Sequence, residues 1–147
     1  MPPEPFAFET VSRLPAPGDN VAIAIRRLEA GTVVDLPGGP RALPHTVLEG
    51  HRFAVKPIAA GEALLSWGLP FGFALTAIAP GDYVSNASML AALAVREIGA
   101  ARLPAQANFR DADETFQLDE RLIQPAPAVA LANPSRTFSG YRRPGAR

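Results

Sequence analysis

The stretch GHRFAVKPIAAGEALLSWGLPFGFALTAIAPGDYV, residues 50–84, contains one phrase twice. Residues 54–62 (AVKPIAAGE) and 74–82 (ALTAIAPGD) share their apolar positions, a glycine and an acidic residue directly after the glycine. A third copy, AIRRLEAGT, occupies residues 24–32. The copies start at positions 24, 54 and 74, whereas the repeats of a solenoid need a fixed period. The phrase therefore indicates bends within one compact domain.

Each copy predicts a corner in which a strand reaches a tight turn and a second strand follows. The turn is built on Ala-Gly or Pro-Gly, and glycine allows the positive φ that such turns use. Between the second and third copies, SWGLPFGFAL (residues 66–75) places Gly68 and Gly72 around Pro70, which predicts a tight loop joining two strands. The sequence therefore predicts a mainly β fold with bent strands.

Proline divides the chain into three parts. Ten of the 16 prolines fall in residues 1–17 and 100–147, and these flanks lack sustained helical or strand periodicity. We therefore expect an N-terminal tail (1–17), a folded domain (18–99) and an extended Pro-rich C-terminal arm (100–147). The arm carries the apolar anchors Phe109, Phe116, Leu118, Phe138 and Tyr141, which favour binding to a partner surface.

One short helix is expected at the end of the folded domain, over residues 88–98. Its apolar residues at positions 90, 93, 94 and 98 share one helical face. Asn86 or Ser88 can cap its start, and Gly99 can end it.

Composition excludes several classes of function. The chain has 147 residues, no cysteine, and 14 basic against 14 acidic residues, so its formal net charge is zero. We do not expect nucleic acid as a partner, because a surface that binds along a phosphate backbone needs an excess of positive charge. No apolar run has the length of about 18 residues that a membrane helix needs, and the opening MPPEPFAFETVSRL lacks the pattern of a secretory signal. We expect a cytoplasmic protein without a membrane segment.

Four segments in order carry a family resemblance: GDNVAIAIRRLEAGTVV, GHRFAVKPIAAGE, WGLPFGFAL and IAPGDYVSN, within residues 18–86. Together they resemble the N-terminal SAF domain of the altronate and galactarate dehydratase family, which implies a β-clip fold. NFRDADETFQLDE and RTFSGYRRPGAR are similar to the connector that leads, in longer members, into a large catalytic domain.

The resemblance implies a hydro-lyase that removes water from a sugar acid, leaving a 2-keto-3-deoxy acid, with a divalent metal such as iron or manganese assisting. Such chemistry needs a base for the proton beside the carboxylate and an acid or metal for the departing hydroxyl. The large catalytic subunit would carry most of this equipment, with the sugar-acid substrate at the junction between the two chains.

His51 is the candidate catalytic residue on this chain. It matches the family's Gly-His-[Lys/Arg]-Phe-Ala motif, and an imidazole near neutrality suits proton transfer or metal ligation. The alternative is a strand-edge histidine that hydrogen-bonds backbone. His45, in a stretch of weak resemblance, is expected at the surface.

Two polar pairs are candidates for substrate binding. Ser85 and Asn86 stand where close relatives of the altronate enzymes carry a His-x-His-Asn cluster, and they can hydrogen-bond hydroxyls or, for Asn86, cap the helix. Asp19 and Asn20 can supply ligand oxygens or form an Asx-turn that starts the first strand.

Three functions therefore remain open. The chain is a small SAF-domain subunit or detached N-terminal part of a sugar-acid dehydratase, inactive alone. Alternatively it is a stand-alone carbohydrate-binding or protein-interaction module, or an inactive truncated remnant. Fold analogy does not choose among them.

Overall fold

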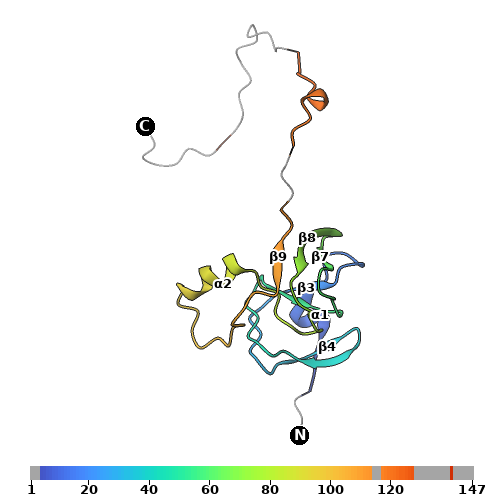
Figure 1. Cartoon of the computed structure of the whole chain (residues 1–147). Coiled ribbons are helices and arrows are strands. Elements are labelled where there is room, and N and C mark those ends of the chain that lie inside the picture. Colours follow the sequence, from blue (N-terminus) through green and yellow to red (C-terminus); the bar gives the residue numbers. More distant parts are fainter. Residues whose placement is uncertain (1–3, 114–116, 128–139, 141–147) are drawn as a thin grey trace. The chain divides into compact units, whose positions relative to one another are not determined.

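The computed structural model describes residues 4–113, 117–127 and 140 (Figure 1). The chain divides into two units, residues 1–114 and residues 115–147. The first unit is mainly β and carries three small sheets, ordered β1-β4-β5, β2-β3-β6 and β7-β8-β9. Its elements are β1 (Phe6–Ala7), α1 (Phe8–Val11), β2 (Ser12–Arg13), β3 (Val21–Ala24), β4 (Val33–Leu36), β5 (Gly39–Ala42), β6 (Arg52–Ala54), β7 (Ala63–Ser66), β8 (Leu69–Ala74), α2 (Ala87–Ala94) and β9 (Phe109–Asp111).

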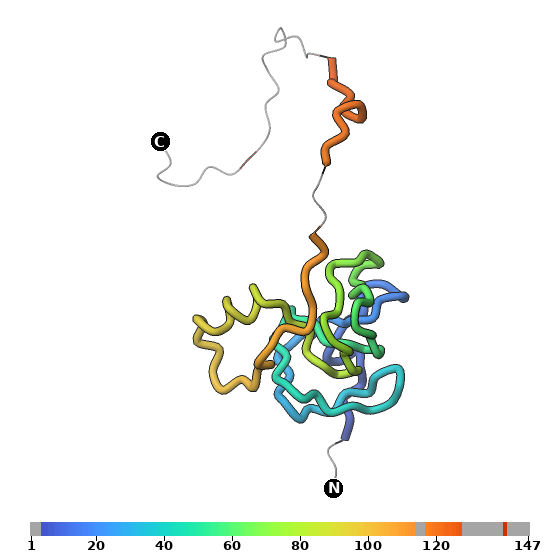
Figure 2. Tube along the Cα trace, in the orientation of Figure 1, coloured from blue at the N-terminus to red at the C-terminus, as the bar shows by residue number. Residues whose placement is uncertain are grey.

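The repeated phrase forms corners, as expected, but there are four of them. The additional corner is LPHTVLEGH, residues 43–51, which begins with leucine and ends with histidine and so escapes the pattern of the other three. In all four corners the glycine has a φ between 80° and 94°, and the next residue donates its N–H across the turn at 3.0 Å; the glycines are Gly31, Gly50, Gly61 and Gly81. Figure 2 follows the chain through these turns.

The corners pair two by two, and the two pairs share one hydrogen-bond pattern. Leu28 and Val47 exchange two backbone hydrogen bonds of 2.8 Å between the first and second corners. Ile58 and Ile78 exchange two of 2.9 Å between the third and fourth. Each corner glycine also donates its N–H to the first residue of the paired corner, at 2.7–2.8 Å. Uneven spacing along the chain is thus compatible with a regular arrangement in space.

Each pair of corners places its main core residues in one hydrophobic cluster, although Val55 of the third corner packs in the cluster of the first pair. The first cluster comprises Val11, Ala22, Ala24, Leu28, Val34, Leu36, Leu43, Val47, Phe53, Val55 and Tyr83. The second comprises Val21, Ala54, Ile58, Leu64, Ala74, Ile78, Val84 and Phe109. The apolar position three residues before each glycine is therefore the core position of its corner.

The folded unit extends beyond the expected limits of residues 18 and 99 on both sides. At the start, β1 pairs in parallel with β4 and β2 pairs antiparallel with β3, and Val11 between them is fully buried. At the end, β9 pairs antiparallel with β8, and Phe109 is 7% exposed. The segments 6–13 and 109–111 are too short to show periodicity in the sequence. Only their pairing with distant strands shows that they belong to the folded unit.

The expected helix is present as α2, and Asn86 caps it. The Asn86 Oδ1 atom accepts a hydrogen bond from the Met89 N–H at 2.8 Å. The helix ends at Ala94, before Gly99, and the Ile98 carbonyl accepts a hydrogen bond from the Arg27 guanidinium at 2.6 Å. That bond ties the segment after α2 to the first corner.

In the second unit, residues 117–127 are described. They hold one 3-10 helix, Glu120–Leu122, capped by the Asp119 side chain. Leu118, Leu122 and Ile123 are exposed. Phe116, Phe138 and Tyr141, expected as anchors of the arm, lie outside the described residues. Among the helices of the described part, none is long and apolar enough to cross a membrane.

Candidate functional site

His51 is the last residue of the second corner. Its backbone is fixed on both sides, because its N–H donates to the Leu48 carbonyl at 3.0 Å and its carbonyl accepts from the Ala24 N–H at 2.8 Å. In the third and fourth corners the same position holds Glu62 and Asp82, whose carboxylates accept the N–H of the residue three before them and so close their own turns. The imidazole of His51 contacts another element instead.

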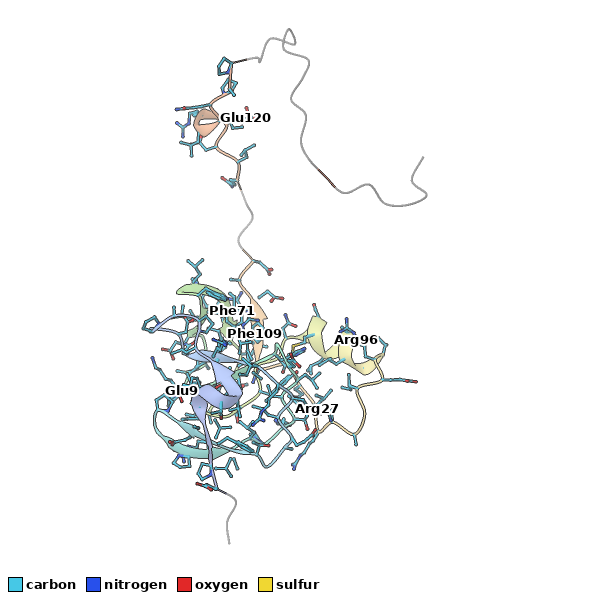
Figure 3. The ribbon with its side chains drawn as sticks, turned by 180° about the vertical axis from the view of Figure 1, so that it is seen from behind. Glu9, Arg27, Phe71, Arg96, Phe109 and Glu120 are labelled. Carbon is cyan, nitrogen blue, oxygen red and sulfur yellow. The ribbon has the colours of Figure 1, made fainter. Side chains whose placement is uncertain are left out.

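That element is the segment after the fourth corner, where Tyr83 lies. The Tyr83 hydroxyl oxygen is 2.7 Å from His51 Nδ1, and the two rings stack with their centroids 5.9 Å apart. Figure 3 draws the side chains of the described residues and labels Arg96, one of the two arginines whose charge acts on His51. Tyr83 is 1% exposed, whereas His51 is partly exposed. The pair therefore joins the buried core to the surface.

Burial shifts the titration of both rings. It raises the pKa of the Tyr83 hydroxyl to about 12, so this group stays protonated at neutral pH. The pKa of His51 is lowered, first by burial and then by the positive charges of Arg52 and Arg96. Both shifts favour an uncharged pair near neutral pH.

Ser85 and Asn86 follow Tyr83 and lie at the start of α2. Asn108 holds this segment, because its Oδ1 accepts the Ser85 N–H at 2.9 Å and its Nδ2 donates to the Tyr83 carbonyl at 2.8 Å. Ser85 Oγ is buried and has no hydrogen-bond partner among the described residues. Sequence reasoning missed Asn108, since it lies in the segment assigned to the arm and nothing local marks it.

Both polar groups of Asn86 are engaged. Its Oδ1 caps α2, and its Nδ2 donates to the two carboxylate oxygens of Asp111 at 2.9 and 3.1 Å. The capping interpretation of Asn86 is confirmed. Contact of Ser85 and Asn86 with a substrate stays a prediction.

Asp19 and Asn20 serve the backbone of the β7–β8 hairpin. The Asp19 carboxylate, fully buried, accepts the N–H groups of Trp67 and Gly68 at 2.8 and 2.9 Å, and also that of Ala16 at 2.9 Å. Asn20 bonds the Ala63 carbonyl and the Leu65 N–H. These bonds give the pair a structural role, but it is a link to a distant hairpin and not the expected Asx-turn, and they lie apart from the hydrogen bonds of His51. Contact of Asp19 and Asn20 with a substrate stays a prediction.

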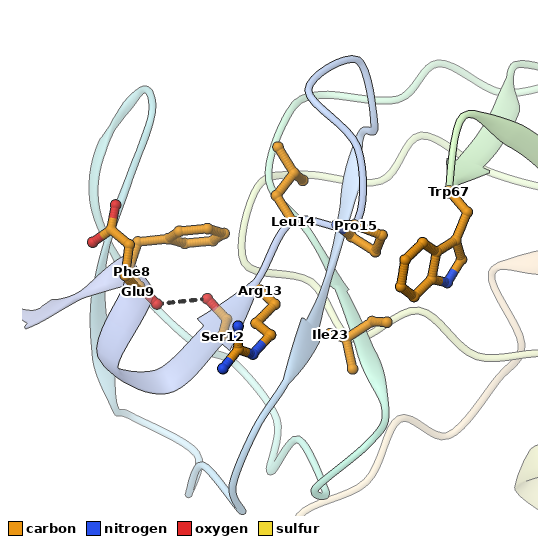
Figure 4. Close-up of a pocket in the computed structure, with 8 residues that line it drawn as sticks. All are labelled: Phe8, Glu9, Ser12, Arg13, Leu14, Pro15, Ile23 and Trp67. Carbon is orange, nitrogen blue, oxygen red and sulfur yellow. Dashed lines mark hydrogen bonds between the residues drawn. The ribbon is translucent and has the colours of Figure 1, made fainter.

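Trp67 is held by Asp19 in a backbone conformation that is unusual for a residue with a side chain. Its φ is 60° and its side chain is exposed. It borders a groove of about 670 Å³ whose other lining residues come from α1, β2, the following loop and β3 (Figure 4). Phe71, in contrast, packs edge-on against Phe109 with the ring centroids 5.4 Å apart. Of these two aromatic residues, Phe71 packs inside the unit and Trp67 lies at its surface.

The described residues do not form a metal centre. They contain no group of three or more His, Asp or Glu side chains placed to hold an ion. The candidate site supplies one imidazole, whose Nδ1 is occupied by Tyr83. His45 lies in the same corner and is partly exposed. A divalent metal would need ligands from outside these residues.

The chain belongs to the altronate/galactarate dehydratase SAF domain family, whose sequence pattern matches residues 14–91. The match begins before β3 and runs into α2, so it includes all four corners, His51 and Tyr83. The chain is also 42% identical, over 66 residues, to altronate dehydratase of Escherichia coli (strain K12). That alignment covers 45% of this chain and 13% of the relative, so the chain spans a small part of that relative's length.

Proposed function

We propose that this chain is the SAF-domain component of a sugar-acid dehydratase and acts together with a large catalytic chain. The observation that carries the proposal is the family match over residues 14–91, which contains a partly exposed histidine paired with a buried tyrosine. The similarity to altronate dehydratase supports a sugar acid such as altronate or galactarate as the substrate class. A sugar-acid hydro-lyase of this kind would act in the cytoplasm.

In this proposal the reaction is the removal of water from a polyhydroxy carboxylate. A base takes the proton beside the carboxylate, and the hydroxyl on the neighbouring carbon leaves as water once it has received a proton. We assign the base and a divalent metal, iron or manganese, to the large chain, because the described residues of this chain supply no metal centre. Bound there, the metal would polarise the departing hydroxyl.

This chain contributes the His51–Tyr83 pair at the junction. Tyr83 fixes the imidazole from the core side, while the partly exposed edge of His51 can meet an oxygen of the substrate. Ser85 lies two residues after Tyr83, and its hydroxyl is buried without a hydrogen-bond partner among the described residues, so it would reach a substrate only after a movement of this segment. The exposed apolar side chains of residues 117–127, Leu118, Leu122 and Ile123, would contribute to binding the large chain.

Reconstitution tests the proposal. The purified chain, a large dehydratase chain lacking its own SAF domain, and ferrous or manganous ions are mixed with altronate or galactarate, and 2-keto-3-deoxy product is measured. We expect product only when both chains are present. Equal product from the large chain alone would exclude this role, and binding of sugar acid without any gain in rate would indicate a non-catalytic binding module.

A further inference from the structure

The protonation state of His51 follows from the hydrogen bond that its buried side makes. Tyr83 Oη is the partner of His51 Nδ1 at 2.7 Å, and Tyr83 is 1% exposed. A hydroxyl can donate or accept, so the distance alone leaves two arrangements. In one, the Tyr83 proton points at Nδ1; in the other, Nδ1–H points at the hydroxyl oxygen.

The surroundings of Tyr83 select the first arrangement. Within the described part of the chain, the Tyr83 hydroxyl has no hydrogen-bond partner other than His51. If it accepted a proton from Nδ1–H, its own O–H would be left buried without an acceptor, which costs about 1–3 kcal/mol. If it donates to Nδ1, no donor of the pair is left unsatisfied. Donation requires a lone pair on Nδ1, and therefore a neutral ring with its proton on Nε2.

The opposite edge of the ring faces solvent. No described residue bonds His51 Nε2, and this atom is not one of the buried side-chain atoms that lack a partner. The charged groups near the ring, Arg52 on β6 and Arg96 beyond α2, are both positive, so they too oppose a charged imidazolium. The exposed edge of His51 is therefore an N–H donor.

We propose that Tyr83 is a positioning residue that holds His51 neutral with its proton on Nε2, so that the SAF domain presents an N–H donor to an oxygen atom of its ligand. A hydroxyl or carboxylate oxygen fits this donor. A metal ion does not, since metal ligation at Nε2 needs a lone pair there. The role toward a sugar acid rests on the proposed function, whereas the tautomer is a property of the chain itself.

Nuclear magnetic resonance tests the tautomer directly on the full chain. The protein has two histidines, so long-range ¹H–¹⁵N correlation of the ¹⁵N-labelled chain gives two imidazole patterns, which His45→Gln and His51→Gln assign. At pH 7.5 we expect His51 to show a protonated Nε2 and an unprotonated Nδ1. A protonated Nδ1 in the wild-type chain would overturn the proposal without any variant.

The variant Tyr83→Phe removes the donor and keeps the ring. Loss of a hydrogen bond to the neutral imidazole should raise the pKa of His51, measured by titrating its ring signals, by about half to one pH unit. The His45 signals in the same spectra are the internal control. An unchanged His51 titration in Tyr83→Phe would also overturn the proposal, provided that the ring signals show a folded chain.

Activity separates this inference from the proposed function. In the reconstituted enzyme, Tyr83→Phe should lower kcat and displace the acid limb of the pH profile, with little change in KM. If the wild-type tautomer and the titration are as expected but no reconstituted activity is found, the proposed function fails and the assignment of the tautomer stands.

Discussion

The ring of Phe109 occupies the space beside Gly72 into which a side chain at position 72 would project. A Cβ placed there would contact the Phe109 ring and lie 2.6 Å from the Arg110 carbonyl oxygen. Phe109 lies on β9 and Gly72 on β8, so the closeness of the two strands depends on the missing side chain.

Gly72→Ala should therefore destabilise the folded unit. Forcing extra volume into a packed contact costs typically about 1–3 kcal/mol, and here one of the contacted atoms belongs to backbone that cannot move aside alone. Urea unfolding followed by circular dichroism measures the change. The matched control is Gly18→Ala, where a Cβ meets nothing within 4 Å and φ is not positive, and its stability should be close to wild type.

Truncation locates the end of the folded unit. A chain ending at residue 113 keeps β9 and Phe109 and should remain folded with a cooperative thermal transition. A chain ending at residue 99 loses both of them and also Asn108, whose side chain bonds the Ser85 N–H. This chain should be strongly destabilised or unfolded, since removing a buried Phe side chain such as that of Phe109 costs about 3–5 kcal/mol. Equal melting temperatures for the two chains would place the boundary at residue 99 after all.

Asp19→Asn should destabilise the fold by roughly 1–3 kcal/mol, because an amide has one acceptor oxygen where the carboxylate uses both for backbone N–H groups. Asp35→Asn, at an exposed position of β4, is the control and should be near neutral. Thermal unfolding of the two variants gives the comparison. If Asp19→Asn is as stable as wild type but lowers affinity for a sugar acid, Asp19 is a ligand residue rather than a structural one.

The lowered pKa of His51 predicts how stability depends on pH. The folded chain binds a proton on His51 at lower pH than the unfolded chain, whose histidine titrates near 6.5. This contribution to stability is present above pH 6.5 and is lost as the pH falls through the folded pKa. Denaturant unfolding between pH 7.5 and 5 should show the loss, and His51→Gln should remove that part of it.

His51→Ala should lower kcat of the reconstituted dehydratase by on the order of a hundredfold, the usual scale for losing a hydrogen-bond donor to charge that develops on a substrate oxygen. Assembly with the large chain should survive, since the side chain is partly exposed. His45→Ala serves as the control and should be nearly neutral. Equal rates for the two variants would return His51 to a structural role and leave Ser85 and Asn86 as candidates beside it in the chain.

Sequence alone was sufficient where the information is local. Three of the four corners could be found because a nine-residue phrase specifies its own turn: glycine supplies the positive φ, and the apolar residue three positions earlier enters the core. The cap of α2 could be found for the same reason, since Asn86 and the Met89 N–H that it bonds are three residues apart. The family also follows from these local segments in their order.

Tertiary structure decided everything that depends on pairing between distant residues. The second corner has a different first and last residue, and only its hydrogen bonds to the first corner identify it. His51 and Tyr83 are 32 residues apart, and no local pattern states that they meet. The same holds for Asn108 and for Phe109, which a Pro-rich composition assigns to an arm. Composition is an average over a whole segment. Burial of a residue in the core depends instead on whether its own side chain packs against a strand that is distant in the sequence.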